Sequence, residues 1–296
     1  MFNRYILLIL ALVCYLSGNA QLSTSKLFFD HLTTEEGLAH NYILSIFQDE
    51  DGFVWLGSDN GLNRYDGQHI DILSSNTKPA LGGNRIRRII QDKSKTLWIL
   101  HENGLDMMDH YTQHIRSFLY GRELKKHILG FGLDDNGDLA AFTESDILLY
   151  NSNSGSFDIK QTAPANFLFS AFVKCGNRYY LGTRRHGIIV YNENWKLLEH
   201  IYPTSIQGGI LEDGLISLLR VDSNGSIWSV MAGLCIQKYD PVTRIVQTYP
   251  LSAHSVINRE VRDIIELNAD YMLVGTFNGL YRLHKRTFQA IVEEGE

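Results

Sequence analysis

Residues 48–57 of the chain read Gln-Asp-Glu-Asp-Gly-Phe-Val-Trp-Leu-Gly, and residues 60–66 continue with Asn-Gly-Leu-Asn-Arg-Tyr-Asp. A weaker copy of this stretch runs from Gln91 to Asp109, and another runs from Asp222 to Asp240. Self-similarity at a regular spacing is the signature of a repeat architecture, so the period of this motif decides the fold.

The tryptophan of the motif is the anchor from which the copies can be counted. Six anchors follow one another: Trp55, Trp98, Ala140, Tyr180, Trp228 and Leu273. The spacings between them are 43, 42, 40, 48 and 45 residues. A second anchor lies shortly after each of the first ones: Gly61, Gly104, Asp146, Gly187, Gly233 and Gly279.

Each unit contains four short apolar or alternating segments separated by turn residues, which predicts four β-strands. No stretch after residue 20 has the 3.6-residue period of a helix pair. The prediction is therefore an all-β fold, a β-propeller of four-stranded blades. The expected blades are about 43–73, 86–119, 128–160, 169–202, 215–249 and 261–292.

One blade alone leaves both of its faces apolar, and stacking blades around an axis buries those faces. The large anchors Trp55, Trp98, Tyr180 and Trp228 are therefore interpreted as packing residues between blades rather than as ligand contacts. Gly61 and its equivalents are expected where a turn requires a positive φ.

Residues 1–20 precede the repeats and have the pattern of a secretory signal peptide. Arg4 is followed by an apolar run from Tyr5 to Leu16 and by a small-residue end at Ala20. The alternative is an uncleaved membrane anchor, for which the run is short. Residues 21–296 then form the predicted propeller domain.

The charge argues against some kinds of partner, and the cysteine content argues against a disulfide. Without Arg4 the chain has 26 basic and 33 acidic residues, which argues mildly against nucleic acid or anionic lipid as a partner. Cys175 and Cys235 fall in different repeats, so buried free thiols are favoured over a disulfide.

The motif resembles the repeat of the two-component-regulator propeller family. The resemblance lies in the run from Gly37 to Ile43 and in the stretch from Asp49 to Asp66. It implies the periplasmic sensor region of a hybrid histidine kinase of the Bacteroidetes, whose usual ligands are oligosaccharides. It also implies a downstream propeller, an immunoglobulin-like domain, a transmembrane helix and a kinase, and it admits a homodimer of the full sensor.

The lead segment Leu27–Leu32 resembles the start of such a sensor and is left over after six four-stranded units. It is expected to serve as the outer strand of a seventh blade whose other strands would begin after Glu296. On this hypothesis the chain is an incomplete seven-bladed propeller, the N-terminal piece of a longer sensor. The alternative is a six-bladed ring with the lead strand packed elsewhere.

No catalytic motif stands out in the sequence. It has no phosphate-binding Gly-x-x-x-x-Gly-Lys, no His-Glu-x-x-His and no Gly-x-Ser-x-Gly, and its 11 histidines are scattered. We therefore expect no catalytic residue, no metal site and no cofactor. The Asp-x-x-Gly turns, such as Asp49 to Gly52, are interpreted as a folding motif in which the aspartate binds its own turn.

Ligand specificity is expected where the copies differ, because the repeated residues hold the fold. The loops between the second and third strands vary, and so do the segments that lead into each first strand. Predicted turns carry His101, Glu102 and Arg184 to His186. Aromatic, amide and guanidinium groups suit sugar hydroxyls, uronates and sulfates. The candidate ligand-binding residues are His40, Asp59, Asn60, Arg85, His101, Glu102, Arg184, Arg185, His186, Phe277 and Asn278.

Three functions remain open from the sequence. The leading one is a periplasmic propeller that senses oligosaccharides and regulates glycan-utilisation genes through downstream kinase modules. The second is a secreted propeller enzyme, a glycan lyase or hydrolase, which would need carboxylates or a His-Tyr-Arg group converging near the axis. The third is a propeller that serves as a protein-interaction platform.

Overall fold

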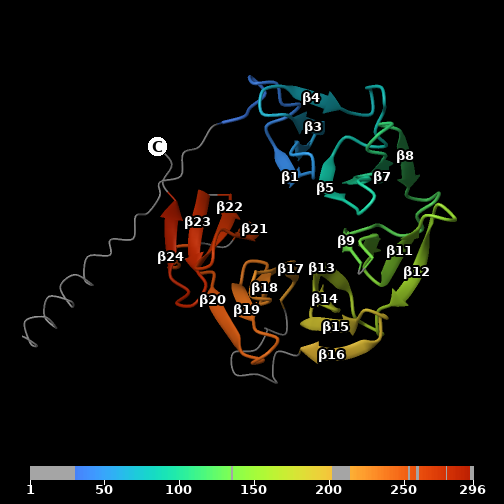
Figure 1. Ribbon diagram of the computed structural model, residues 1–296. Helices are drawn as coiled ribbons and strands as arrows, with labels where there is room; N and C mark the ends of the chain where they lie inside the picture. The colour runs from blue at the N-terminus through green and yellow to red at the C-terminus, as the bar shows by residue number, and fades with distance from the viewer. Residues whose placement is uncertain are drawn as a thin grey trace, which may run out of the picture. The chain divides into compact units, whose positions relative to one another are not determined.

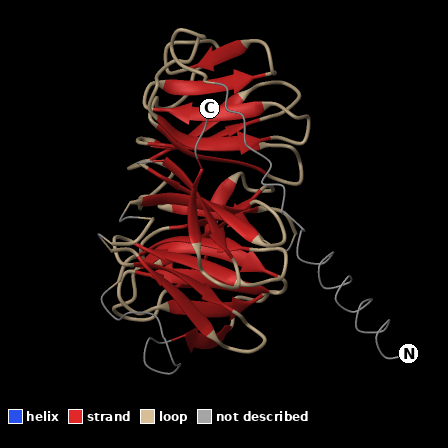
Figure 2. Cartoon of the chain, turned by 90° about the vertical axis from the view of Figure 1, so that its left-hand side faces the viewer, coloured by secondary structure: helices blue, strands red, loops and turns tan. Residues whose placement is uncertain are grey.

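The computed structural model describes residues 31–134, 136–201, 214–252, 254–257, 260–277 and 279–293. Within these ranges all regular secondary structure is β-strand, as Figure 2 shows in red. The strands form six sheets, each with four strands joined to their neighbours in order of sequence, and every pairing is antiparallel. The described part of the chain is thus a six-bladed β-propeller, as the repeat predicts.

Blade 1 comprises β1 (Ile43–Gln48), β2 (Val54–Ser58), β3 (Gly61–Tyr65) and β4 (Ile70–Leu73). Blade 2 comprises β5 (Ile86–Gln91), β6 (Leu97–His101), β7 (Gly104–Met108) and β8 (Ile115–Leu119). Blade 3 comprises β9 (Gly130–Leu133), β10 (Leu139–Phe142), β11 (Asp146–Asn151) and β12 (Ser156–Thr162).

Blade 4 comprises β13 (Phe169–Cys175), β14 (Arg178–Thr183), β15 (Ile188–Asn192) and β16 (Leu197–Ile201). Blade 5 comprises β17 (Ile216–Val221), β18 (Ile227–Met231), β19 (Cys235–Tyr239) and β20 (Val246–Pro250). Blade 6 comprises β21 (Val261–Glu266), β22 (Tyr271–Thr276), β23 (Gly279–His284) and β24 (Ala290–Glu293).

The six sheets lie in a ring, and the first strand of each blade is the one nearest the centre (Figure 1). Because neighbouring strands are antiparallel, their connections emerge at two opposite ends. We call the end with the first-to-second and third-to-fourth strand turns the turn face. The loop face is the other end, with the second-to-third strand loops and the segments that lead into each first strand. Figure 2 shows the connections gathered at these two ends.

The turn face is built on the repeated aspartate. In blade 1, the Asp49 carboxylate accepts hydrogen bonds from the backbone N–H groups of Asp51 and Phe53, at 3.0 and 2.9 Å. Its second oxygen accepts the indole N–H of Trp55 at 2.7 Å. The aspartate therefore holds both its own turn and the large anchor of the second strand.

The same arrangement recurs wherever the sequence retains both residues. The indole N–H of Trp98 donates to Asp92 at 2.8 Å, and that of Trp228 donates to Asp222 at 2.9 Å. In blade 3 the anchor is Ala140, and Asp134 accepts backbone N–H groups alone. The interpretation of the turn as a folding motif agrees with these contacts.

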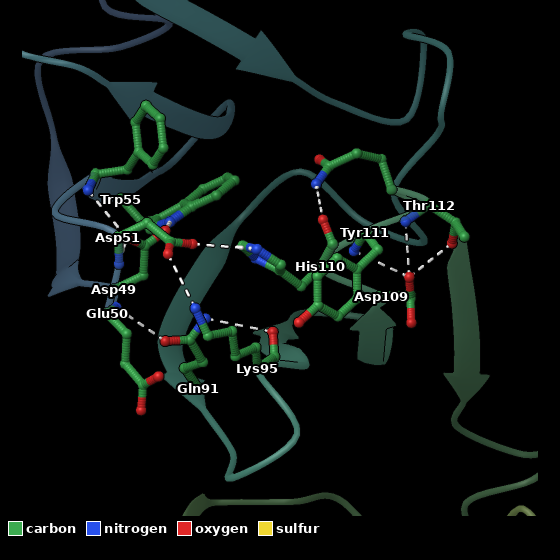
Figure 3. Close-up of polar contacts among 12 residues, drawn as sticks. Asp49, Glu50, Asp51, Trp55, Gln91, Lys95, Asp109, His110, Tyr111 and Thr112 are labelled. Atoms are coloured by element: carbon green, nitrogen blue, oxygen red, sulfur yellow. Dashed lines mark hydrogen bonds and ion pairs between the residues drawn. The ribbon is translucent and has the colours of Figure 1, made fainter.

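Adjacent blades are also joined across the turn face (Figure 3). The Asp51 carboxylate of blade 1 lies 3.0 Å from the Lys95 ammonium and 3.1 Å from His110 Nε2, both from blade 2. The Gln91 side-chain oxygen accepts the backbone N–H of Glu50 at 3.0 Å. The hydrogen bond from Lys95 is the largest cause of the lowered pKa of Asp51.

The core consists of five apolar clusters of described residues, each between two consecutive blades. The large anchors take part in them, and each lies between its own blade and the next. Trp98 is fully buried and packs edge-on against Tyr150 of blade 3 with ring centroids 4.7 Å apart. Burial of about 150–250 Å² for each such aromatic makes these contacts a main source of stability.

The repeated glycine after the anchor has a steric cause. Gly104 has φ of 155°, and a Cβ atom there would lie 2.1 Å from the carbonyl oxygen of Phe118. No side chain fits at that distance, because the backbone of the fourth strand closes against this turn. Gly61 likewise has a positive φ, of 130°, as expected from the sequence.

Blade 1 packs against blade 2 and blade 6 packs against blade 5, and each keeps an apolar side chain exposed on its other face. Ile46 of β1 is 70% exposed and Ile265 of β21 is 51% exposed. Residues 27–30 of the expected lead strand lie outside the described residues, and His31 and Leu32 belong to no strand. The seventh blade therefore stays a prediction.

The structure also bears on the expectations for the cysteines, for residues 1–20 and for a membrane-spanning helix. Cys175 and Cys235 are free thiols, as predicted, but only Cys235 is buried, and Cys175 is partly exposed. Burial raises the pKa of Cys235 to about 11. Residues 1–20, the expected signal peptide, lie outside the described ranges. Among the described residues no helix has the length and apolar character needed to cross a membrane.

Candidate functional site

The loop face brings several of the candidate ligand-binding residues together between blades 1 and 2. The Arg85 guanidinium lies 2.8 Å from the Asp59 carboxylate. The Glu102 carboxylate accepts the backbone N–H groups of Asn84 and Arg85, at 3.1 and 2.8 Å. Three of the candidates, from different segments of the chain, thus meet in one polar group.

Glu102 is ionised in this setting. Burial raises the pKa of its carboxyl, but the backbone N–H groups of Glu102, Asn84 and Arg85 outweigh burial and the net shift is downward. Glu102 also lines a hollow of about 410 Å³ with Gly82, Asn103, Leu119, Tyr120, Arg122 and His127. The rings of Tyr120 and His127 lie 4.1 Å apart there.

A larger hollow opens on the loop face at blades 3 to 5. Its volume is about 560 Å³, and it is lined by Leu129, Ser170, Arg184, Arg185 and Leu215. We call it the arginine hollow. Arg184 and Arg185 follow β14, whereas the other three residues lie at or just before the innermost strands β9, β13 and β17. The hollow therefore reaches from a variable loop to the centre of the ring.

The two arginines are positioned differently. Arg184 forms an ion pair with Glu144 of blade 3, and each side chain is 49% exposed. The backbone N–H of Arg184 donates to the carbonyl oxygen of Leu168 at 3.0 Å, which fixes the loop against blade 4. No ion pair of Arg185 is present within the described residues, so its guanidinium is available to a ligand in the hollow.

His186 contributes mainly to the structure of the same loop. Its ring lies 4.4 Å from the ring of Phe167, and its backbone N–H donates to the Thr183 hydroxyl at 2.9 Å. Its carbonyl oxygen is hydrogen-bonded to Nε2 of His200 on β16. Burial is the main cause of the lowered pKa of His200.

His101 is not a turn residue, in contrast to the sequence expectation. It is the last residue of β6, and its side chain is fully buried with Nε2 3.3 Å from the buried Asp106 carboxylate. The turn that follows is only two residues long, so His101 remains in the strand and points inward. This geometry removes His101 from contact with a ligand on the surface.

The remaining candidates lie apart from the arginine hollow. His40 accepts the backbone N–H of Tyr42 at 3.0 Å, and Asn60 is an exposed loop residue. Phe277 is 53% exposed, and the Arg262 guanidinium lies 4.3 Å from its ring centroid. Asn278 lies outside the described residues. The structure thus divides the candidates into three places on the loop face rather than one.

The sequence did not point to the residues that line the hollows at the innermost strands or in the connection between β8 and β9. Ser170, Leu129 and Leu215 are small or apolar and carry no motif, so only the ring places them beside Arg185. Tyr120 and His127 had a usable signal, since they lie in the long connection between β8 and β9 on the loop face.

The site has the groups for binding rather than for an evident reaction. Guanidinium groups, backbone N–H donors and exposed rings bind carboxylates, sulfates and sugar hydroxyls. No group of three or more His, Cys, Asp or Glu side chains in the described part of the chain is placed to hold a metal ion.

Comparison with known proteins connects the repeat to a family. Residues 37–60 match the family model described as two component regulator propeller. The matched residues span the segment before β1, then β1 and β2. They include Asp49, Trp55 and the loop-face residue Asp59, so the match covers the first part of the stretch that predicted the fold and ends before Gly61. No curated protein matches the chain by sequence.

Solved structures resemble the chain over nearly its whole length. The extracellular domain of the hybrid two component system BT3049 from B. thetaiotaomicron matches with a TM-score of 0.69, 19% identity and 90% of this chain. The corresponding domain of BT4673 from the same organism gives a TM-score of 0.65 and 19% identity over 86% of this chain. The chain spans 37% of the length of each of these two structures.

An enzyme has a similar fold. Virginiamycin B lyase from Staphylococcus aureus matches with a TM-score of 0.67 and 13% identity, over 86% of this chain and 85% of the lyase. At identities of 13–19% these likenesses show the fold. Because one fold hosts both sensors and an enzyme, function has to be argued from the site.

Proposed function

We propose that this chain is a periplasmic ligand-sensing propeller of a hybrid two-component system, which detects an oligosaccharide on its loop face. On this proposal residues 1–20 direct export, and the ligand changes the relation between the propeller and downstream modules. Those modules would be a second propeller, an immunoglobulin-like domain and a kinase that regulates glycan-utilisation genes, with a homodimer as the signalling unit.

The match of residues 37–60 to the two component regulator propeller model carries the proposal. The extracellular domains of two component systems that share the fold support it. The expected signal peptide and the likeness to extracellular domains support a periplasmic location.

The arginine hollow supports an oligosaccharide as the ligand. Its volume of about 560 Å³ falls within the usual range of ligand pockets, roughly 300–1,000 Å³. Two arginines and the Ser170 side chain lie beside two leucines in its lining. Sugars present both hydroxyl groups and apolar ring faces, so this mixture of polar and apolar lining suits them.

Calorimetry of the purified chain with a panel of neutral, uronic-acid and sulfated oligosaccharides tests the proposal. We expect saturable binding of at least one oligosaccharide and loss of that binding in Arg185→Ala. Binding of no member of the panel would contradict oligosaccharide sensing. Binding that Arg185→Ala leaves unchanged would remove the arginine hollow as its site.

A second candidate function is that of a secreted lyase. The likeness to virginiamycin B lyase over 86% of this chain favours it. Mass spectrometry of each oligosaccharide after incubation with the chain separates the two functions. A sensor leaves the ligand intact, whereas a lyase gives a product with a new double bond.

A further inference from the structure

The innermost strands place one residue of each blade at the same level near the loop face. In five blades this residue follows an irregularity in strand pairing: Ser45, Arg88, Ala171, Leu218 and Asp263. The equivalent residue of β9 is Gly130, which pairs with Phe142 of β10. Arg88 and Asp263 are the charged members of this level.

Arg88 of β5 lies beside Gly130 of β9, in the next blade. A Cβ atom at position 130 would lie 3.5 Å from Arg88 Cζ, so the guanidinium lies directly over the glycine. The Arg88 side chain is half-buried. Its neighbour Arg87 is exposed.

The charges around Arg88 are not balanced. Asp263 is already paired with Arg220, whose Nη2 lies 2.9 Å from its Oδ1. No hydrogen bond or ion pair of Arg88 occurs within the described ranges of the chain. Burial, followed by the positive charge of Arg220, lowers the pKa of Arg88, and the negative charge of Asp263 acts in the opposite direction.

Two residues that line the arginine hollow are next in sequence to members of this level. Leu129 lines the hollow, and the next residue is Gly130, over which Arg88 lies. Ser170 lines the hollow as well, and the next residue, Ala171, is at the level of Arg88. Arg88 itself does not line the hollow, so an anion at Arg88 would lie near the hollow rather than within its lining.

We propose that Arg88 forms an anion-binding site in the central channel, for the carboxylate or sulfate group of a ligand or for a free oxyanion of the same chemistry. A guanidinium presents a planar fork of N–H donors that matches such oxygens. An unpaired cation inside a protein is costly, and an anion with two or more oxygens removes that cost. The inference rests on the channel alone and does not require oligosaccharide sensing.

Thermal unfolding of the full chain, with sodium sulfate or sodium glucuronate titrated against chloride at matched ionic strength, tests the site. Arg88→Ala is compared with the wild type and with Arg87→Ala, which removes an equal charge from the adjacent exposed position. We expect a saturable rise in Tm for the wild type and Arg87→Ala, with Kd weakened about tenfold or more in Arg88→Ala. Neutral glucose is expected to give no rise.

Sulfate also stabilises proteins by exclusion from their surface, so only the difference between variants counts. Equal titrations for Arg88→Ala and the wild type would overturn the site, as would the absence of a saturable rise in the wild type. If Arg88→Ala does not fold, Arg88→Lys takes its place in the test. This variant keeps the positive charge but lacks the planar fork of N–H donors, so we expect it to bind the anion more weakly than the wild type, and equal binding would overturn the site.

The two anion arms identify the source of the bound group. Tighter binding of a uronate-terminated disaccharide than of sulfate assigns the site to the acidic group of a sugar. Equal or tighter binding of sulfate assigns it to a free oxyanion. A positive result beside a failed oligosaccharide panel would leave the anion site standing and remove the sensing proposal.

Discussion

The two ends of the strands differ in what repeats. On the turn face, Asp49, Asp92 and Asp222 make the same three hydrogen bonds and each holds a buried tryptophan. On the loop face, the equivalent loops carry an ion pair in one blade, a histidine stack in another and an exposed phenylalanine in a third. The repeated end therefore supplies stability, and the variable end is free to supply recognition.

Two hollows of nearly equal volume, one on each face, also differ in the residues that line them. The arginine hollow of about 560 Å³ has two guanidinium groups in its lining. A hollow of about 550 Å³ between blades 3 and 4 on the turn face is lined largely by apolar residues and glycine, including Phe131, Gly132 and Phe172. Size alone does not distinguish these places. The turn-face hollow has one charged donor, Lys174, among mostly apolar residues, whereas two arginines line the arginine hollow.

The largest expected effect is a loss of stability when the tryptophan between two blades is removed. Trp98→Ala removes a fully buried ring from the contact between blades 2 and 3, and large-to-small aromatic changes in a core cost about 3–5 kcal/mol. Urea unfolding followed by tryptophan fluorescence and circular dichroism measures the loss. Trp98→Phe is the matched control and should lose less, because it keeps a buried aromatic ring, although a smaller one, and removes the N–H bond to Asp92. A loss below about 1 kcal/mol for Trp98→Ala would show that the anchor is not a main packing residue.

The next effect compares two copies of one motif. Asp92→Ala removes a carboxylate that accepts two backbone N–H groups and one indole N–H, and we expect a loss of about 2–3 kcal/mol. Asp134→Ala should lose less, because Ala140 leaves that carboxylate with backbone donors alone. Urea unfolding of both variants gives the difference. Equal losses would show that the indole bond contributes nothing to the turn.

A smaller effect on stability sharpens the role of the loop face. Arg184→Ala breaks a half-exposed ion pair, so the free energy of unfolding should change by at most about 0.5–1 kcal/mol. Its affinity for the oligosaccharide should nevertheless fall by about tenfold. The matched control is Lys93→Ala, which breaks the similarly exposed pair with Asp138 on the turn face. Calorimetry should show unchanged affinity for Lys93→Ala, and an equal fall in both variants would contradict the assignment of faces.

The smallest effect concerns pH. The pKa of His200 is lowered in the folded state, so the unfolded chain binds its proton more readily. The contribution of His200 to the free energy of unfolding is complete above the unfolded-state pKa of about 6.5 and is lost as the pH falls through the folded-state pKa. Tm measured between about pH 7.5 and 5 should therefore fall less steeply for His200→Asn than for the wild type. Parallel curves would show that His200 does not contribute to the acid sensitivity of the loop.

The fold was predictable because its determinants are local and repeated. The aspartate, the tryptophan and the glycine each act within one blade or against the next, so every copy carries the same signal. The indole bond from Trp55 to Asp49 was not predicted, although the constant spacing of six residues between the two in blades 1, 2 and 5 would have suggested it.

The candidate site was predictable only in part. Arg184 and Arg185 were found because the loops between the second and third strands differ from copy to copy, and in this copy the loop carries two guanidinium groups. His101 was misplaced because its buried partner Asp106 belongs to the following strand. Arg88 was missed because its neighbour Gly130 is distant in sequence and lies beside it only in the ring.

Hydrogen–deuterium exchange of the chain with and without a bound oligosaccharide tests the central claim that recognition belongs to the loop face. Slower exchange is predicted for the backbone N–H groups of residues 168–170 and 184–186, with no change in the turns at 49–53, 92–96 and 222–226. Slower exchange confined to those turns would contradict the claim.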